Sequence, residues 1–161
     1  MNIFKTFLIG LLLVAVPIAP AYSQKKKKKK KKKHRITAVI STAKGYIGTP
    51  YRYGGTSRKG IDCSGLMLQC YKKIGVKLPR TAKEQSKYGN KVSWGNLKKG
   101  DIVFFKFKQK GEKWYHSGMI SSVKGENIRF IHASSSKGVV ESNLMVDYYR
   151  KKVKNFRRVI K

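Results

Sequence analysis

Residues 48–71 read GTPYRYGGTSRKGIDCSGLMLQCY, a glycine-rich loop followed by an amphipathic segment. Apolar side chains recur at helical spacing after Cys63, and this pattern predicts a helix that begins there. Asp62 is a suitable N-cap for that helix, and Gly75 is a suitable end. A thiol in the first turn of a helix lies near the positive end of the dipole and near free backbone N–H groups, which favour the thiolate. Cys63 is therefore placed where a nucleophile is expected.

The chain has two cysteines, Cys63 and Cys70, and both belong to the same predicted helix. Their spacing along a helix puts the two Cα atoms about 10 Å apart along the axis. A disulfide requires Cα atoms within about 7 Å of each other. We therefore expect both thiols to be free. Cys70 lies among the apolar residues and is expected to pack in the core.

The first 23 residues resemble an export signal. Lys5 precedes an apolar run over residues 7–16, and Ala-Tyr-Ser at residues 21–23 resembles a small-x-small cleavage site. The run is short for a membrane span, which needs about 20 residues, and an uncleaved anchor is the alternative. No cysteine lies near the cleavage point, so a lipid anchor is not expected. Residues 1–23 are therefore predicted to be a signal peptide that exports the chain to the periplasm, the cell envelope or the exterior.

The chain is strongly basic. Its formal charge is +31, and leaving out Lys5 and the nine lysines Lys25–Lys33 reduces it to +21. A run of like charges buries nothing and repels itself, so residues 24–35 are predicted to form a disordered, solvated tether. A basic surface attracts polyanions. For an exported protein these are anionic cell-envelope polymers, and nucleic acid is not expected as a partner. The alternative is that the lysine run has no selected task.

Residues 36–161 have the length and apolar content of one domain. Short helices are predicted over residues 36–47 and after Thr81, whose spacing to Glu84 makes a capping box. β-Branched and aromatic runs then predict strands over residues 102–107, 114–123, 128–133, 139–140 and 153–160. Short connecting loops imply an antiparallel meander. The order predicts an α+β fold, with N-terminal helices packed on an antiparallel β-sheet. No repeat or added binding module is visible, and a monomer is expected.

His116 and His132 lie on two predicted strands, and neighbouring antiparallel strands can bring them together on one face. With Cys63 they would supply a nucleophile, a base and a group that orients the base. The three side chains could instead bind zinc, although the closely spaced ligand pairs typical of zinc sites are absent. They could also be ordinary core or surface residues. From spacing alone, the three interpretations stay open.

Five blocks of sequence resemble, in order, the signature of the NlpC/P60 cysteine peptidases. The first block, within residues 51–66, contains YRYGG and GIDCSGL. The other four are LPRT at 78–81 with Gln85, GDIVFF at 100–105, HSGMI at 116–120 and FIHAS at 130–134. Together they extend over about residues 38–160. The resemblance implies a papain-like fold and peptidoglycan hydrolysis. The compact layout is similar to that of the small, Spr-like murein endopeptidases.

Carried over by motif, the resemblance implies that Cys63 is the nucleophile, His116 the base and His132 the third, orienting residue. The implied reaction is attack on an amide of the peptidoglycan stem peptide through an acyl-enzyme, with no cofactor and no metal. The bond could be γ-D-glutamyl–diamino acid or the D-alanyl–diamino acid crosslink. The alternatives are a non-catalytic, basic envelope-binding protein, and an amidase or acyltransferase on the same scaffold.

The resemblance also implies roles for residues around the nucleophile. Tyr51 matches a position whose hydroxyl stabilises the oxyanion together with the Cys63 N–H, and a packed loop aromatic is the alternative. Asp62 and Ser64 match positions that contact the substrate peptide, while Asp62 is also the expected helix cap. Ser117 departs from the family pattern, which often has valine, and is expected to affect only local packing.

Overall fold

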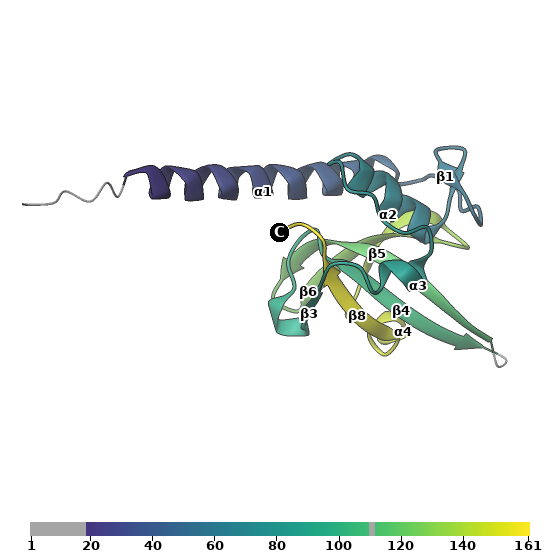
Figure 1. Ribbon diagram of the computed structural model, residues 1–161. Coiled ribbons are helices and arrows are strands. Elements are labelled where there is room, and N and C mark those ends of the chain that lie inside the picture. Colours follow the sequence, from purple (N-terminus) through teal and green to yellow (C-terminus); the bar gives the residue numbers. More distant parts are fainter. Residues whose placement is uncertain (1–18, 110–111) are drawn as a thin grey trace, which may run out of the picture.

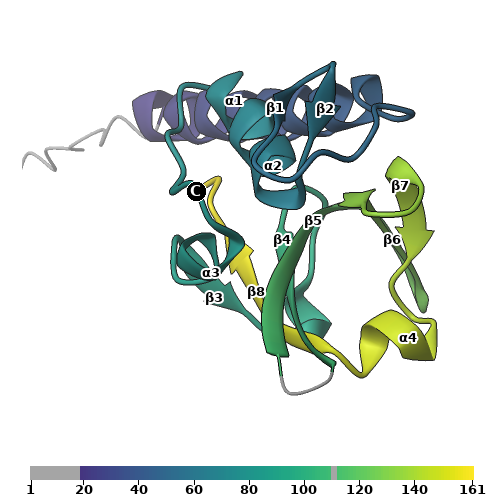
Figure 2. The same cartoon turned by 90° about the vertical axis from the view of Figure 1, so that its right-hand side faces the viewer.

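The computed structural model describes residues 19–109 and 112–161, in which helices pack on an antiparallel sheet (Figure 1). The two longest helices are α1 (Ala19–Gly45) and α2 (Cys63–Lys72), and Figure 2 shows both above the sheet. This arrangement confirms the predicted α+β class. Within the described ranges, no helix is both long and apolar enough to span a bilayer. Most of the predicted signal peptide, residues 1–23, lies outside the described residues.

The main sheet has six strands, and each neighbouring pair is antiparallel. In spatial order the strands are β3 (Asn90–Val92), β8 (Val153–Arg158), β4 (Ile102–Gln109), β5 (Glu112–Lys124), β6 (Asn127–Ser134) and β7 (Gly138–Asn143). Strands β4 to β7 form the predicted meander, and β8 lies on its other side beside β4. The sequence did not predict β3, because three residues are too few to show a period.

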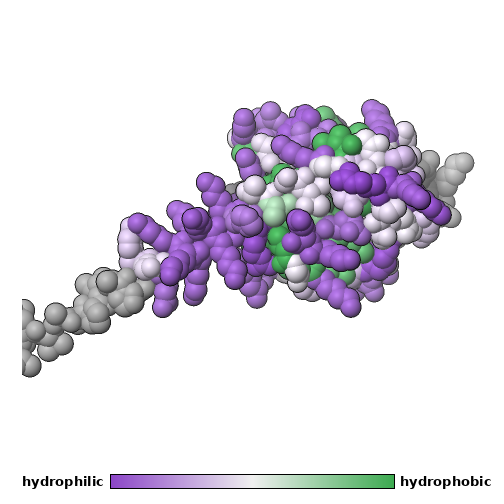
Figure 3. Space-filling view, turned by 90° about the horizontal axis from the view of Figure 1, so that it is seen from above, coloured by the Kyte–Doolittle hydropathy of each residue, from purple (hydrophilic) through white to green (hydrophobic). Residues whose placement is uncertain are grey.

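The lysine run differs from its prediction. Residues 24–35 lie inside α1 instead of forming a disordered tether. The second half of α1 is anchored because Val39 and Ala43, spaced one turn apart, are fully buried in the core. A helix that is nucleated there can propagate backwards through lysine, which has a good helix propensity. Repulsion between lysines three and four residues apart opposes this extension. Figure 3 shows the resulting hydrophilic rod, which projects from the body of the domain.

The ends of the next two helices agree with the sequence. Asp62 caps α2, because its carboxylate accepts a 2.6 Å hydrogen bond from the Gly65 N–H. After α2 the chain turns at Gly75, whose φ is 73°. α3 (Ala82–Gln85) carries the predicted capping box between Thr81 and Glu84. The start of α2, and with it Cys63, is thus set by local hydrogen bonds.

Besides β3, four short elements had no sequence prediction. They are β1 (Thr56–Ser57) and β2 (Gly60–Ile61), which form a small hairpin before α2, the 3₁₀-helix η1 (Trp94–Asn96), and α4 (Asp147–Arg150) between β7 and β8. Elements of two to four residues are too short for a hydrophobic period, so long-range contacts decide them.

The sheet is apolar on both faces. One cluster joins Leu66 and Tyr71 of α2 to Phe104 of β4, and the other contains Phe105 and Phe130. Phe104 and Phe105 point to different clusters because successive side chains of a strand alternate. Each fully buried side chain of this size contributes roughly 2 kcal/mol. Tyr71 also donates a 2.7 Å hydrogen bond to the carbonyl of Gly100. This packing holds α2, and therefore Cys63, against the sheet.

Candidate active site

Cys63 is the first residue of α2, and close backbone contact holds this end of the helix. The Asp62 N–H donates a 3.1 Å hydrogen bond to the Gly55 carbonyl. The same carbonyl lies against Gly65, where an added Cβ would come within 2.3 Å of its oxygen. A side chain at Gly65 would therefore push the loop off the helix. The glycines of the opening stretch let the loop pack directly on the nucleophile's helix.

The surroundings of Cys63 favour the neutral thiol. Burial raises its pKa above the usual value, and the negative charge of Asp62 adds to this. The backbone N–H and the hydroxyl of Ser117 lower the pKa but do not offset burial. The helix start favours the thiolate, as expected, but desolvation has the larger effect on the pKa of Cys63. The expectation that Ser117 affects only packing is wrong, because it influences this thiol.

The hydroxyl of Ser117 is itself unusual. Ser117 is fully buried, and its Oγ has no hydrogen-bond partner among the described residues. Buried polar atoms are rarely left without a partner. Since Ser117 lies beside the Cys63 thiol, a thiolate formed there would be the natural acceptor for this hydroxyl.

The two histidines predicted to pair do so. His116 of β5 and His132 of β6 lie on neighbouring strands, and His116 Nε2 is 2.8 Å from His132 Nδ1. His132 is 2% exposed. Burial lowers the pKa of His116 to about 3, with a further decrease from His132, and burial lowers the pKa of His132 to about 4. Both rings are therefore neutral at pH 7, and His116 can act as a base.

The hydrogen-bonded chain continues beyond His132. Its Nε2 is 3.0 Å from the Ser142 hydroxyl of β7 and 3.3 Å from the Tyr149 hydroxyl of α4. Neither residue was predicted from the sequence. Ser142 lies ten residues from His132, and Tyr149 belongs to an element too short to predict, so no motif or spacing pointed to them.

Two hollows meet at Cys63. The smaller, of about 150 Å³, is lined by both histidines and by Tyr149. The larger, of about 470 Å³, extends past Asp62, Ser64 and Arg80. Both hollows share four lining residues, Tyr51, Cys63, Trp114 and Tyr115. Cys63, His116, His132 and Tyr51, all expected at the site from the sequence, therefore lie around one place, with open space on two sides of the thiol.

Asp62, Ser64 and Arg80 form one hydrogen-bonded group in the wall of the larger hollow. Arg80 donates to both Asp62 oxygens, at 3.1 and 2.6 Å, and to the Ser64 hydroxyl at 2.9 Å. Burial alone would raise the pKa of Asp62, but the hydrogen bonds from Arg80 and the Gly65 N–H hold it below its usual range. The Arg80 side chain is still 41% exposed. Arg80 belongs to the LPRT motif at 78–81, but no role for it was predicted from the sequence.

The described residues contain no group of three or more His, Cys, Asp or Glu side chains arranged to hold a metal ion. Cys63 and Cys70 are both free thiols, as expected from their spacing on one helix. The described part of the site therefore has the composition of a thiol and a histidine pair.

Comparison with known proteins agrees with the motif resemblance. Residues 48–158 match the NlpC/P60 family. The probable endopeptidase NlpC of Escherichia coli is 41% identical over 113 residues, which cover 70% of both chains. The murein DD-endopeptidase MepS/murein LD-carboxypeptidase of Escherichia coli is 39% identical over 114 residues. That match covers 70% of this chain and 57% of the relative.

Solved structures lead to the same family. An NlpC/P60 family protein from Bacillus cereus superposes with a TM-score of 0.69 at 31% identity. The match covers 78% of this chain and 40% of that protein, so the Bacillus protein has regions with no counterpart here. Because the family match extends over most of the chain and two relatives share about two fifths of the aligned residues, this chain belongs to the NlpC/P60 family.

Proposed function

We propose that this chain, a peptidoglycan hydrolase of the NlpC/P60 family, cleaves an amide bond within the stem peptide with Cys63 as nucleophile. The observation that carries the proposal is the position of Cys63 where two hollows meet. A peptide bound across the thiol can continue on both sides of the reacting bond, as an endopeptidase requires. The histidine pair lines one of these hollows.

The proposed reaction starts from a neutral thiol and a neutral His116. With Nε2 engaged by His132, His116 offers Nδ1 as the base. The Cys63 proton moves to Nδ1 while the sulfur attacks the amide carbonyl. The C–N bond then breaks, and the leaving amine takes the proton from His116. Water hydrolyses the thioester by the same proton route, which releases the carboxylate and restores the thiol.

The negative charge on the carbonyl oxygen needs hydrogen-bond donors. The Cys63 backbone N–H lies at the open start of α2, where it has no partner within the helix. Burial and the neighbouring Cys63 and Asp62 raise the pKa of Tyr51, so its phenol keeps its proton. We assign Tyr51 and the Cys63 N–H as the two donors to this oxygen.

Arg80, with Asp62 and Ser64, is the proposed contact for the stem peptide. Stem peptides carry carboxylates, and a half-exposed guanidinium held in one orientation suits them. For the bond itself, the name of the DD-endopeptidase relative favours the D-alanyl–diamino acid crosslink. The γ-D-glutamyl–diamino acid bond is the second candidate.

Digestion of purified sacculi, with mass spectrometry of the released muropeptides, tests the function. The wild-type chain is expected to release fragments with a new free amine on the diamino acid, and Cys63→Ala is expected to release none. Full release by Cys63→Ala would overturn the proposal. A cut at the muramyl–peptide amide would identify an amidase, and peptide joined to an added amine an acyltransferase. Binding without any release would identify an envelope-binding protein.

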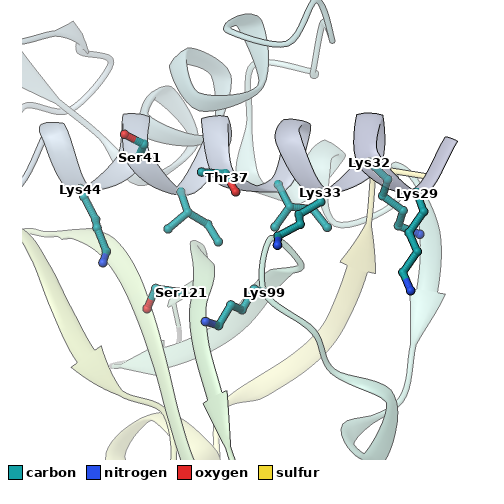
Figure 4. Close-up of a pocket in the computed structure, with 10 residues that line it drawn as sticks. Lys29, Lys32, Lys33, Thr37, Ser41, Lys44, Lys99 and Ser121 are labelled. Carbon is teal, nitrogen blue, oxygen red and sulfur yellow. The ribbon is translucent and has the colours of Figure 1, made fainter. Parts of the chain in front are cut away.

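A second proposal concerns anionic cell-envelope polymers as partners of Lys25–Lys33. A hollow of about 620 Å³ lies between α1 and the sheet, and Figure 4 shows lysine side chains of α1 and Lys99 pointing into it. Its lining includes five lysines and no carboxylate. Partly buried Ile36 and Ile40 complete this wall. Unneutralised ammonium groups around one hollow attract a polyanion strongly at low salt.

Sacculus binding at several salt concentrations tests this partner. Deletion of residues 25–33 is expected to weaken binding and to flatten its salt dependence, and Lys99→Gln is expected to act in the same direction. Lys72→Gln, at the far end of α2, serves as a control of equal charge. Unchanged affinity and salt dependence after the deletion would mean that the run is a passive spacer.

The last part of the proposal concerns export and the mature form of the chain. We expect residues 1–23 to be removed, the domain over residues 36–161 to act as a monomer outside the cytoplasmic membrane, and no lipid to be attached. The intact mass of the chain recovered from the envelope fraction tests cleavage and lipidation together. Light scattering on the purified chain tests the monomer.

A further inference from the structure

The second histidine of the site is followed by two hydroxyl groups. His132 Nδ1 faces His116, while its Nε2 faces Ser142 Oγ at 3.0 Å and Tyr149 Oη at 3.3 Å. These residues come from three different elements, β6, β7 and α4. Ser142 is opposite Phe130 in the register of β6 and β7, which makes it a diagonal neighbour of His132.

Because the residue that orients His116 is itself a histidine, the pair has two possible arrangements of its N–H protons. A neutral imidazole has one N–H and one lone pair, and either nitrogen can carry the proton. If His132 carries it on Nδ1, it donates to His116 Nε2, so the His116 proton is on Nδ1. That nitrogen then cannot take the thiol proton. If His132 carries its proton on Nε2, His116 donates through Nε2 and keeps Nδ1 free. Only the second arrangement is competent as a base.

We propose that Ser142 and Tyr149 are positioning residues that hold the histidine pair in this competent arrangement. The inference rests on the proposed function of Cys63 and His116. In the competent arrangement His132 Nε2–H needs an acceptor, and the Ser142 and Tyr149 oxygens supply one. Once His116 has taken the thiol proton, both of its nitrogens carry hydrogen, so His132 must accept at Nδ1 and donate from Nε2. The two hydroxyl oxygens thus stabilise the charged form of the pair.

The surroundings of His132 leave these oxygens with little competition. The Phe130 ring stacks on the imidazole at 4.6 Å, and the Tyr149 ring meets it edge-on at 5.4 Å. Within the described residues, Ser142 and Tyr149 are the hydrogen-bond partners of Nε2. A buried N–H without a partner is unfavourable. Loss of both hydroxyls would therefore favour the incompetent arrangement.

The charged and titratable groups around the pair come from several elements. The same hollow is lined by the thiol of Cys63 and by the phenols of Tyr51, Tyr115, Tyr148 and Tyr149. The carboxylate of Asp62 raises the pKa of His116 slightly against the effect of burial. Ser142 does not titrate, and Tyr149→Phe keeps the ring, so these changes leave the other charges in place. A change in pH profile can then be assigned to the hydroxyls.

The test compares Ser142→Ala, Tyr149→Phe and the double variant in stem-peptide cleavage across pH. We expect the double variant to lower kcat roughly 10- to 100-fold with little change in KM, because about 1.4 kcal/mol corresponds to tenfold. The acidic limb of the profile should move to lower pH, since the protonated pair has lost its acceptors. Ser142→Thr keeps a hydroxyl and should therefore retain the activity that Ser142→Ala loses. Ser122→Ala and Tyr88→Phe serve as matched controls.

The direction of the pH shift separates positioning from packing. Loosened packing would hydrate the histidines and move the acidic limb towards higher pH, nearer the ordinary histidine pKa. A lower kcat with that upward shift would overturn the proposal, as would an unchanged kcat and profile in the double variant. Alkylation of Cys63 by iodoacetamide across pH gives a readout without a peptide substrate. If the wild type cleaves no stem peptide, the proposed function fails, whereas slower alkylation in the double variant still supports the hydroxyls.

Discussion

The two ends of α2 carry a cysteine each and have opposite surroundings. Cys70 is fully buried in the apolar core, and burial raises its pKa to about 12. Cys63 is 8% exposed at the helix start, beside Ser117, the histidine pair and two hollows. Burial raises both pKa values, so burial alone does not distinguish a reactive thiol from a packing one. The difference lies in which groups can take the proton and stabilise the anion.

The largest expected effect follows from exchanging the two cysteines for alanine one at a time. Cys63→Ala should lower sacculus digestion by at least about a thousandfold, because the nucleophile is lost. Cys70→Ala should keep most activity and cost roughly 1–2 kcal/mol of stability through a small cavity. Digestion assays and urea unfolding of both variants measure this contrast. Equal loss of activity in the two variants would contradict it.

The two histidines should likewise differ in how much their substitution lowers kcat. His116→Gln removes the base and is expected to lower kcat by about 10²–10⁴. His132→Asn is expected to lower kcat less, since an amide oxygen can still accept from His116 Nε2–H. Steady-state kinetics on a defined muropeptide give both values. A larger loss in His132→Asn than in His116→Gln would reverse the two assigned roles.

The two buried histidines of the site should also make the folded protein less stable at acidic pH. His116 and His132 have pKa values of about 3 and about 4 in the folded protein, against about 6.5 when unfolded. The unfolded chain therefore binds more protons below about pH 6.5, and stability falls as the pH decreases from there towards 4. For buried His132 this amounts to about 2 kcal/mol between pH 7 and pH 5.

Urea unfolding at pH 7, 6 and 5 measures this dependence, and His132→Asn should flatten it. Cys70→Ala is the matched control at the other end of α2, because Cys70 does not titrate in this range. An equally steep pH dependence in His132→Asn would show that other groups cause the acid sensitivity.

The smallest expected effect concerns Ser117. Its N–H and hydroxyl lower the pKa of the Cys63 thiol, and its hydroxyl has no other partner among the described residues. Ser117→Val keeps the N–H and replaces the hydroxyl by two methyl groups, so the thiol pKa should rise and alkylation near pH 8 should slow by about three- to tenfold. Ser117→Thr should behave like the wild type. Unchanged alkylation in Ser117→Val would leave the buried hydroxyl without this role.

Local patterns predicted most of the scaffold. The start of α2 at Cys63 follows from Asp62, the capping box of α3 follows from Thr81 and Glu84, and five of the six strands follow from their composition. The pairing of His116 with His132 followed from two adjacent strands. The helical lysine run was not predicted, because its order depends on a neighbouring segment that is anchored by Val39 and Ala43 in the core.

The sequence by itself determined where the helix of the nucleophile begins, which strands form the sheet and which family the chain resembles, because these depend on neighbouring residues and on motifs. Only the tertiary structure decided the protonation of Cys63 and the partners of His132. Desolvation of the thiol, the reach of Ser142 and Tyr149, and the orientation of Arg80 all arise from residues far apart in the chain. Burial and hydrogen-bond geometry are properties of the packed molecule, so no local pattern carries them.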